Sequence, residues 1–160
     1  MLPIHFLSDR HPLRGEDAVA AIITVEDGRY LMQLRDDIPG IFYPGHWGCF
    51  GGAVASGEDG LLALRRELAE ELEMQELVAD EFLRLDFDLR KLCQKHCYRI
   101  YYEVRTTESN VAQFVLHEGA EMRLFAPNEL FDLHVTPYDS FALWLHFART
   151  RFSVANSETD

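Results

Sequence analysis

Three glutamates in the middle of the chain have the spacing of a cation site. Glu67, Glu70 and Glu71 lie at i, i+3 and i+4, so on a helix their carboxylates share one face. Like charges at these spacings each cost an isolated helix about 0.2–0.5 kcal/mol, and Arg66 can offset only part of that repulsion. A hard divalent cation would offset it, because Mg²⁺ takes oxygen ligands and completes its shell with waters and phosphate oxygens. The alternative is a solvated acidic face on a surface helix.

The residues before these glutamates favour the metal interpretation. Gly51 and Gly52 end a short predicted strand, and a tight turn leads from them into the acidic helix. Paired glycines allow a close backbone approach that a side chain would block. The pattern Gly52, five residues, Glu58, seven residues, Arg66-Glu67-Leu68-Ala69-Glu70-Glu71 and the aliphatic Met74 resembles the signature of the Nudix (MutT-like) hydrolases, with Trp47, Gly51 and Gly57 as similar flanks.

Two positions depart from the family pattern. Phe50 replaces a common proline, and Glu73 stands where the family usually has glycine before the final aliphatic residue. A glycine at a helix end usually serves a left-handed turn, so Glu73 bears on the helix exit and not on the metal ligands. Residues 74–77 tolerate a helix, which favours continuation past Glu73. Further on, residues 117–125 look like the family segment that brings an extra glutamate, here Glu118, to the site.

The resemblance implies a role for each residue of this pattern. The metal set would be Gly51, through its carbonyl, with Glu67, Glu70 and Glu71, and the cofactor would be Mg²⁺ with Mn²⁺ as a substitute. Arg66 would orient a glutamate. The reaction implied is hydrolysis of a nucleoside diphosphate linked to another group, in which water attacks one phosphorus and a glutamate takes its proton. We expect Glu67 to be that base, with Glu118 as its competitor.

Aromatic and basic residues outside the pattern are candidates for substrate contact. Phe42, Tyr43 and Trp47 could stack on a nucleobase, or they could fill the seam between loop and sheet. The main basic concentration is Arg84, Arg90, Lys91, Lys95 and Arg99, which could meet phosphates or form a solvated hairpin. The substrate-binding set we expect is Arg35, Tyr43, Trp47 and Arg99.

Other functions have weaker support in the sequence. Cys93-Gln94-Lys95-His96-Cys97 invites a structural zinc site, but no second ligand cluster has matching spacing. A Nudix-like module that senses a nucleotide without turnover is the alternative function, and such a module should lack one or more of the three glutamates. All three are present, which favours catalysis. Diphosphate isomerisation, a third use of the fold, has no motif of its own.

Local patterns predict the elements that position these residues. Apolar, β-branched residues over 18–25 and 29–35 predict a hairpin across Asp27-Gly28. Residues 36–46 are typical of a loop, and 47–54 predict a short strand interrupted by the glycine pair. The acidic helix is expected from about Glu58 to Met74, with Ser56 as its N-cap and a buried stripe of Leu61, Leu64, Leu68 and Leu72.

The second half predicts further strands and a terminal helix. Strands are expected over 82–89, 97–105, 111–116 and 121–125, with a turn at 106–110 and a helical turn at 127–130. Residues 137–151 predict an amphipathic helix that carries Phe141, Leu145 and Ala148 on one side, with Trp144 beside them. The fold class is therefore α/β (α+β), and the resemblance implies a Nudix-type α/β/α sandwich with a mixed β-sheet between helices.

Composition limits the partners and the compartment. The chain has 160 residues, 48% of them hydrophobic, which suits one domain over residues 1–152 and a polar tail over 153–160. A net charge of −12 repels a polyanion, so we expect a small nucleoside diphosphate derivative, such as a nucleotide sugar or ADP-ribose-like compound, and no nucleic acid polymer. Three cysteines and the lack of a signal or membrane segment indicate a cytoplasmic protein without a membrane partner. A homodimer is left open.

Overall fold

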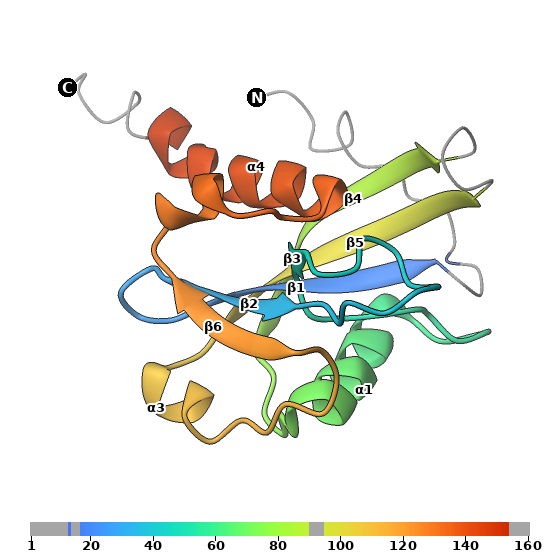
Figure 1. Cartoon of the computed structure of the whole chain (residues 1–160), viewed down its shortest axis with the longest axis horizontal. Coiled ribbons are helices and arrows are strands. Elements are labelled where there is room, and N and C mark those ends of the chain that lie inside the picture. The colour runs from blue at the N-terminus through green and yellow to red at the C-terminus, as the bar shows by residue number, and fades with distance from the viewer. Residues whose placement is uncertain (1–12, 14–16, 90–94, 154–160) are drawn as a thin grey trace.

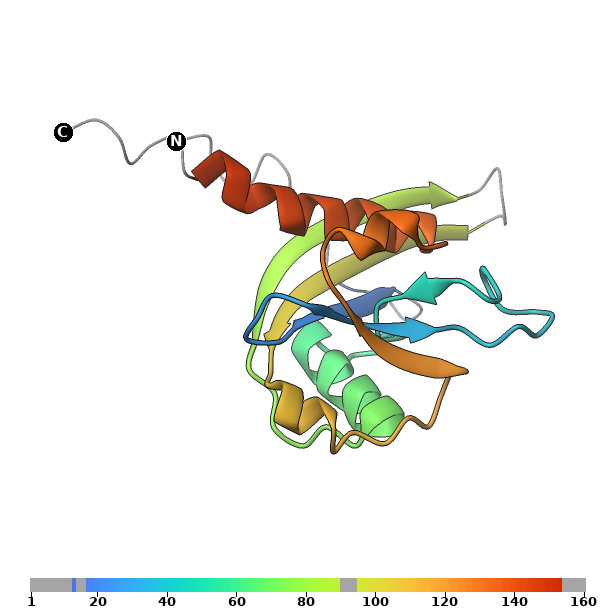
Figure 2. The ribbon, with the colours of Figure 1, turned by 60° about the vertical axis from the view of Figure 1, so that its left-hand side comes forward.

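The computed structural model describes residue 13, residues 17–89 and residues 95–153. A mixed six-stranded sheet lies between two helical layers (Figure 1). Helix α1 (Gly60–Leu72) covers one face of the sheet and helix α4 (Pro137–Ser153) covers the other, as the turned view in Figure 2 also shows. The predicted α/β/α sandwich is confirmed.

The sheet is built around a central parallel pair of strands. Its strands are β1 (Ala18–Thr24), β2 (Tyr30–Leu34), β3 (Trp47–Gly48), β4 (Ala79–Leu89), β5 (Lys95–Arg105) and β6 (Glu121–Phe125). Their order is β3-β2-β1-β5-β4, and β6 also pairs with β2. Strands β1 and β5 run parallel, with Ala20 opposite Tyr101, and the other pairs are antiparallel. The predicted turn between β1 and β2 is confirmed, with Gly28 at φ +84°.

Strand β1 is buried on both faces, which explains its continuous apolar sequence. On the α1 side, its residues join a core cluster with the leucines of that helix: Val19, Ala21, Ile23, Leu64, Leu68 and Leu72. On the α4 side, Ala20 and Ile22 pack with Ala142 and Leu143. The predicted leucine stripe is therefore the buried face of α1, with Leu61 only partly buried at its edge.

Both predicted ends of the acidic helix are wrong. The helix begins at Gly60, and its N-cap is Asp59, whose Oδ1 accepts from the N–H groups of Leu61 and Leu62 at 2.9 Å each. Ser56 lies too far before the first turn to reach those donors. At the other end the helix stops at Leu72, because Glu73 takes the left-handed conformation (φ 56°, ψ 25°) and donates its N–H to the Ala69 carbonyl.

The strand predicted over residues 111–116 is also wrong. Residues Glu108–Val111 form a short helix, α3, and the chain then crosses the C-terminal end of α1. There the N–H groups of Val115 and His117 donate to the carbonyls of Leu72 and Glu71 at 3.2 and 2.9 Å. Helix-end carbonyls lack partners within their own helix, so this segment satisfies them and is not available to pair with a strand.

The terminal helix buries a face that is offset from the one predicted and shares Ala148 with it. A 3₁₀ helix, η2 (Glu129–Asp132), precedes it, which confirms the helical turn expected to open at 127–130. In α4 the buried residues include Ala142, Leu143, His146 and Ala148, whereas Phe141 and Trp144 are each 48% exposed. The inward face is offset because small Ala142 lies against the sheet and buried His146 hydrogen-bonds the Tyr30 hydroxyl at 2.8 Å.

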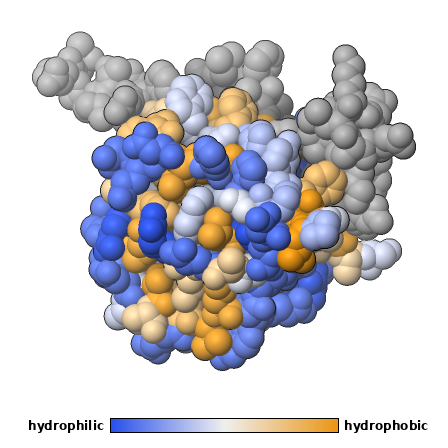
Figure 3. Space-filling model, viewed as in Figure 1, coloured by the Kyte–Doolittle hydropathy of each residue, from blue (hydrophilic) through white to orange (hydrophobic). Residues whose placement is uncertain are grey.

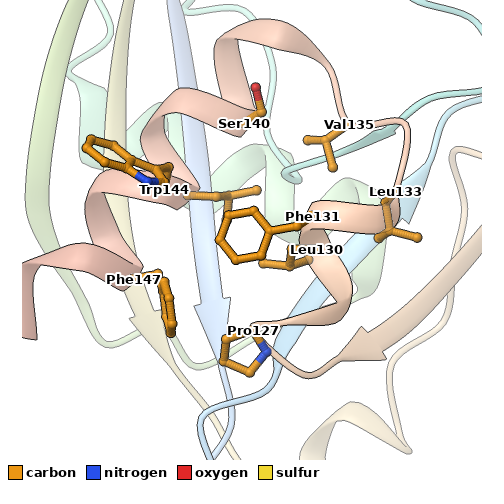
Figure 4. Close-up of a pocket in the computed structure, with 9 residues that line it drawn as sticks. Pro127, Leu130, Phe131, Leu133, Val135, Ser140, Trp144 and Phe147 are labelled. Atoms are coloured by element: carbon orange, nitrogen blue, oxygen red, sulfur yellow. The ribbon is translucent and has the colours of Figure 1, made fainter. Parts of the chain in front are cut away.

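The surface carries an apolar pocket away from the acidic helix. The pocket has a volume of about 260 Å³ and lies between η2 and α4 (Figure 4), lined by Pro127, Leu130, Phe131, Leu133, Val135, Ser140, Leu143, Trp144 and Phe147. None of these side chains is charged, so the pocket offers no carboxylate to a hard cation. On the face seen in Figure 3, hydrophilic residues surround smaller apolar patches. Among the described helices, none has both the length and the apolar character needed to cross a membrane.

Candidate active site

The glycine pair brings the start of the site against α1. Gly51 has φ +126°, and a Cβ there would lie 2.9 Å from the Ala20 Cα and closer still to the Val19 carbonyl oxygen. The Gly51 N–H donates to Glu71 Oε2 at 2.9 Å. Only glycine combines this backbone conformation with so close an approach to β1. The glycine therefore lets the loop backbone come within hydrogen-bonding distance of a carboxylate of α1.

Glu71 is the most deeply placed acid of the site. It is 4% exposed, and burial raises the pKa of its carboxyl to about 8, with repulsion from Glu118 and Glu67 adding to the effect. The hydrogen bond from Gly51 opposes this shift but does not cancel it. A buried carboxylate held among other carboxylates is a group that a bound cation would stabilise.

Glu67 occupies the space that Gly52 leaves open. A Cβ on Gly52 would lie 2.5 Å from the Glu67 Cδ, so any other residue would displace the carboxylate. Burial raises the pKa of Glu67, although Arg66 Nη1 donates to its Oε1 at 2.6 Å and favours the charged form. The second glycine of the pair therefore makes room for the second acid.

Arg66 ties the helix to the glycine-rich loop. It donates to both carboxylate oxygens of Glu58 at 3.1 and 3.0 Å, to Glu67 and to the Ala53 carbonyl at 2.9 Å. These bonds lower the pKa of Glu58. Glu70 is the outer member of the group, because its side chain is 64% exposed and its Oε2 lies 3.6 Å from Arg66 Nη1.

The loop before β6 adds a fourth acid, and it is bound by a β2 residue that the sequence analysis missed. The carboxylate of Glu118 is exposed, and it lies near enough to raise the pKa of Glu67 and of Glu71. The missed residue is Gln33 of β2, which is buried and donates from Nε2 to the Glu118 carbonyl at 2.8 Å. The available signal was one polar residue at an inward position of an otherwise apolar strand.

The donor set fits a hard divalent cation. Glu67, Glu70, Glu71 and Glu118 offer carboxylate oxygens and Gly51 offers a carbonyl, and such oxygens are the ligands of Mg²⁺ and Mn²⁺. The absence of a side chain at Gly52 makes room for the carboxylate of Glu67, one of these ligands. Within the described ranges, no three acidic, histidine or cysteine side chains lie close enough together to hold a metal ion as they stand, so the exact ligand set is a prediction.

Two of the predicted substrate residues, Tyr43 and Arg99, lie against the same aromatic ring, that of Tyr138. Tyr43 has φ +51°, and its ring lies 5.5 Å from that of His46 and 5.7 Å from that of Tyr138. Arg99 lies 5.1 Å above the same Tyr138 ring, but its side chain is 12% exposed and is paired with Asp139 at 3.4 Å. Tyr138, which the sequence analysis did not select, therefore links these two candidates.

The other candidates for substrate contact have partners within the protein or lie outside the described residues. Trp47 packs edge-on to Phe125 at 4.7 Å, and Arg35 donates to the Phe42 carbonyl at 2.8 Å. Arg84 is paired with Glu81 at 2.6 Å. Residues 90–94 lie outside the described residues, as do the side chains of 95–97, so the basic cluster there and the cysteine-histidine motif stay untested.

Comparison with known proteins identifies the family. A model described as the NUDIX domain matches residues 15–145. The chain belongs to the Nudix family. Nucleoside triphosphatase NudI of Salmonella typhimurium is 33% identical over 125 residues, which cover 73% of this chain and 88% of that protein. This Nudix protein is therefore a hydrolase of phosphorus-containing acid anhydrides, as the sequence predicts.

Solved structures confirm the Nudix-type fold. A mutT/nudix family protein from Listeria innocua superposes with a TM-score of 0.72 at 18% identity, covering 90% of this chain and 99% of its own. A MutT protein from Methanosarcina mazei gives 0.69 at 22% identity, with the same coverage. The dihydroneopterin triphosphate pyrophosphohydrolase of E. coli gives 0.65 at 19% identity and covers 82% of this chain and 95% of its own.

Proposed function

We propose that this Nudix hydrolase cleaves the phosphoanhydride bond of a small nucleotide with the acids of α1 and a Mg²⁺ cofactor. The observation that carries the proposal is the buried Glu71 carboxylate, fixed by the Gly51 N–H at 2.9 Å beside Glu67 and facing the charge of Glu118. A surface helix that was merely acidic would leave these carboxylates in water, where their repulsion is weak.

Each group has a role in this proposal. Glu67, Glu70, Glu71 and the Gly51 carbonyl hold the cation, which when bound neutralises the negative charge of the phosphate oxygens. Glu67 accepts the proton of the attacking water, and Glu118 is the competing base. Arg66 keeps the Glu67 carboxylate in place through its bond at 2.6 Å, while its bonds to Glu58 fix the arginine itself.

The substrate class is drawn from charge and from the named relative. NudI is a nucleoside triphosphatase, and a nucleoside triphosphate is a nucleoside diphosphate whose linked group is phosphate. We therefore place nucleoside triphosphates first and the nucleotide sugars and ADP-ribose-like compounds expected from the sequence second. The net charge of −12 disfavours capped RNA or another polymer, because its phosphates lie beyond the reach of a bound cation.

The test is a substrate panel with product masses. Nucleoside triphosphates, nucleotide sugars, ADP-ribose and a capped oligonucleotide are incubated with the whole chain in Mg²⁺, in Mn²⁺ and in excess chelator. We expect metal-dependent cleavage of small nucleotides, fastest with a triphosphate, and none with chelator. Faster cleavage of the capped oligonucleotide would overturn the substrate class. Tight nucleotide binding without any cleavage would instead identify the sensing module.

Several expectations remain predictions. They are the preference for Mg²⁺ over Mn²⁺, the cytoplasmic location, the homodimer and the single domain over residues 1–152. Residues 154–160 of the predicted tail lie outside the described residues, and α4 itself runs to Ser153. Sedimentation of the purified chain would measure the oligomeric state directly.

A further inference from the structure

Gln33 places an amide where the strand otherwise carries apolar groups. It lies two residues after Leu31, which packs in the α1-side core, so its side chain is on the same side of the sheet, and it is 4% exposed. A buried amide without hydrogen bonds destabilises a protein, whereas an apolar side chain of similar size would be tolerated there. The bonds that this amide makes therefore indicate what it does.

The amide nitrogen of Gln33 binds the loop that carries Glu118. An amide NH₂ group has two protons to donate. One bond goes to the Glu118 carbonyl at 2.8 Å, and the side chain lies near enough to the Glu71 carboxylate to lower its pKa slightly, against the larger effect of burial. Gln33 thus binds the loop that carries one acid, on the side of the sheet where α1 carries the others.

The same loop is fixed on both sides of Glu118. The His117 N–H donates to the Glu71 carbonyl at 2.9 Å, and the Ala120 N–H donates to the Leu34 carbonyl at 2.8 Å. Between these bonds, Gly119 has φ +88°, and a Cβ there would lie 2.8 Å from the Gln33 Cγ. The backbone passes directly over Gln33, and glycine is the residue that permits it.

These contacts act against the repulsion between the acids. Without a bound cation, the charges of Glu118, Glu71 and Glu67 repel one another, which favours an outward position of the exposed Glu118 side chain and its loop. We propose that Gln33 is a positioning residue that holds the Glu118 loop against Glu71, so that the acids are assembled before the cation arrives. The inference rests on the proposed function, because it concerns the same acids.

The experiment measures cation affinity apart from activity. Gln33→Leu and Gln33→Met replace the amide by apolar groups, and Gly119→Ala pushes the loop off the amide from the other side. The matched control is Gln113→Leu, which removes another amide-to-carbonyl bond, from Gln113 Nε2 to the Ser109 carbonyl at 3.2 Å. Mn²⁺ is titrated into each whole chain without substrate, kcat and KM are measured on the best substrate, and melting is recorded with and without Mn²⁺.

We expect the Gln33 variants to bind Mn²⁺ at least about 10-fold more weakly than the parent, since residues that orient metal ligands typically contribute 10–100-fold. The loss should appear in kcat, with KM within about threefold, and the metal-free variants should melt at or above the parent temperature. Parent-like Mn²⁺ affinity in a folded Gln33 variant, with or without a loss of stability, would overturn the proposal. If neither Gln33 variant folds, parent-like affinity in Gly119→Ala would overturn it. A parent without turnover refutes the proposed hydrolysis, while the Mn²⁺ titrations still judge Gln33.

Discussion

The left-handed residue at the end of α1 gives a stability prediction with a definite sign. Glu73 has φ 56° and ψ 25°, a conformation that costs a residue with a Cβ about 1–2 kcal/mol. Glycine avoids that cost but loses about 0.4–1 kcal/mol through the greater entropy of its unfolded chain. At the centre of these ranges, glycine should be better than alanine at position 73 by about 0.8 kcal/mol.

Comparison with alanine isolates the backbone effect. The Glu73 carboxylate pairs with His117 Nε2 at 2.7 Å, and both side chains are about half exposed. An exposed pair of this kind contributes about 0.2–1 kcal/mol. Glu73→Gly and Glu73→Ala both lose it, so the difference between the two variants reports the left-handed conformation alone. Relative to the parent, Glu73→Gly should be near neutral or slightly stabilised, and Glu73→Ala should be destabilised.

Thermal melting of the metal-free chain is a sufficient assay. In a domain of this size, 1 kcal/mol shifts the melting temperature by about 2–4 °C, so Glu73→Gly should melt roughly 2–3 °C above Glu73→Ala. A residue inside a continuing helix would give the reverse order, because glycine is about 1 kcal/mol worse than alanine there. An alanine variant that melts at or above the glycine variant would therefore refute the left-handed exit.

Two further predictions concern a helix start and a partly buried ion pair. Asp59→Ala should lower the free energy of unfolding by about 1 kcal/mol, because the N–H groups of Leu61 and Leu62 lose their acceptor. Ser56→Ala should change it little. Equal losses in urea unfolding of the two variants would contradict the assigned N-cap. Hydrogen bonds from Arg149 lower the pKa of Glu103 to about 2 from 4.5, so the pair's stabilisation is complete above about pH 5 and is lost as the pH falls toward 2. The stability difference between the parent and Arg149→Gln should therefore shrink between about pH 6 and pH 3, and a constant difference would count against the pair.

Local sequence patterns predicted the elements whose partners are near in the chain. The β1–β2 hairpin follows from an Asp-Gly turn between two apolar runs, and the stripe of α1 follows from helical spacing. The strand expected at 111–116 failed for a long-range reason, since the N–H groups of Val115 and His117 are bound by the end of α1. The inward face of α4 likewise depends on Tyr30, which meets His146 across more than a hundred residues.

The candidate site divides in the same way. The spacing of Glu67, Glu70 and Glu71 and the glycines before them could be found from the sequence, because these residues act within one turn and one helix. The position of Gln33 could not, because the carbonyl to which it donates lies on the loop before β6, far along the chain. Nor could the sequence show that Tyr138 would lie between Tyr43 and Arg99, since that contact depends on how α4 packs on the sheet.

The most direct test of the proposed metal-dependent hydrolysis is the turnover of Glu71→Gln at saturating Mg²⁺, beside Glu76→Gln as a control on an exposed glutamate just past the helix. The amide keeps the shape of the side chain but is a neutral and poorer ligand for a hard cation. Since residues that only orient ligands contribute 10–100-fold, loss of Glu71 should lower turnover by at least about 100-fold in a folded chain, with parent-like rates in Glu76→Gln. Turnover of Glu71→Gln within a few-fold of the parent would contradict the assignment of Glu71 and, with it, the proposed site.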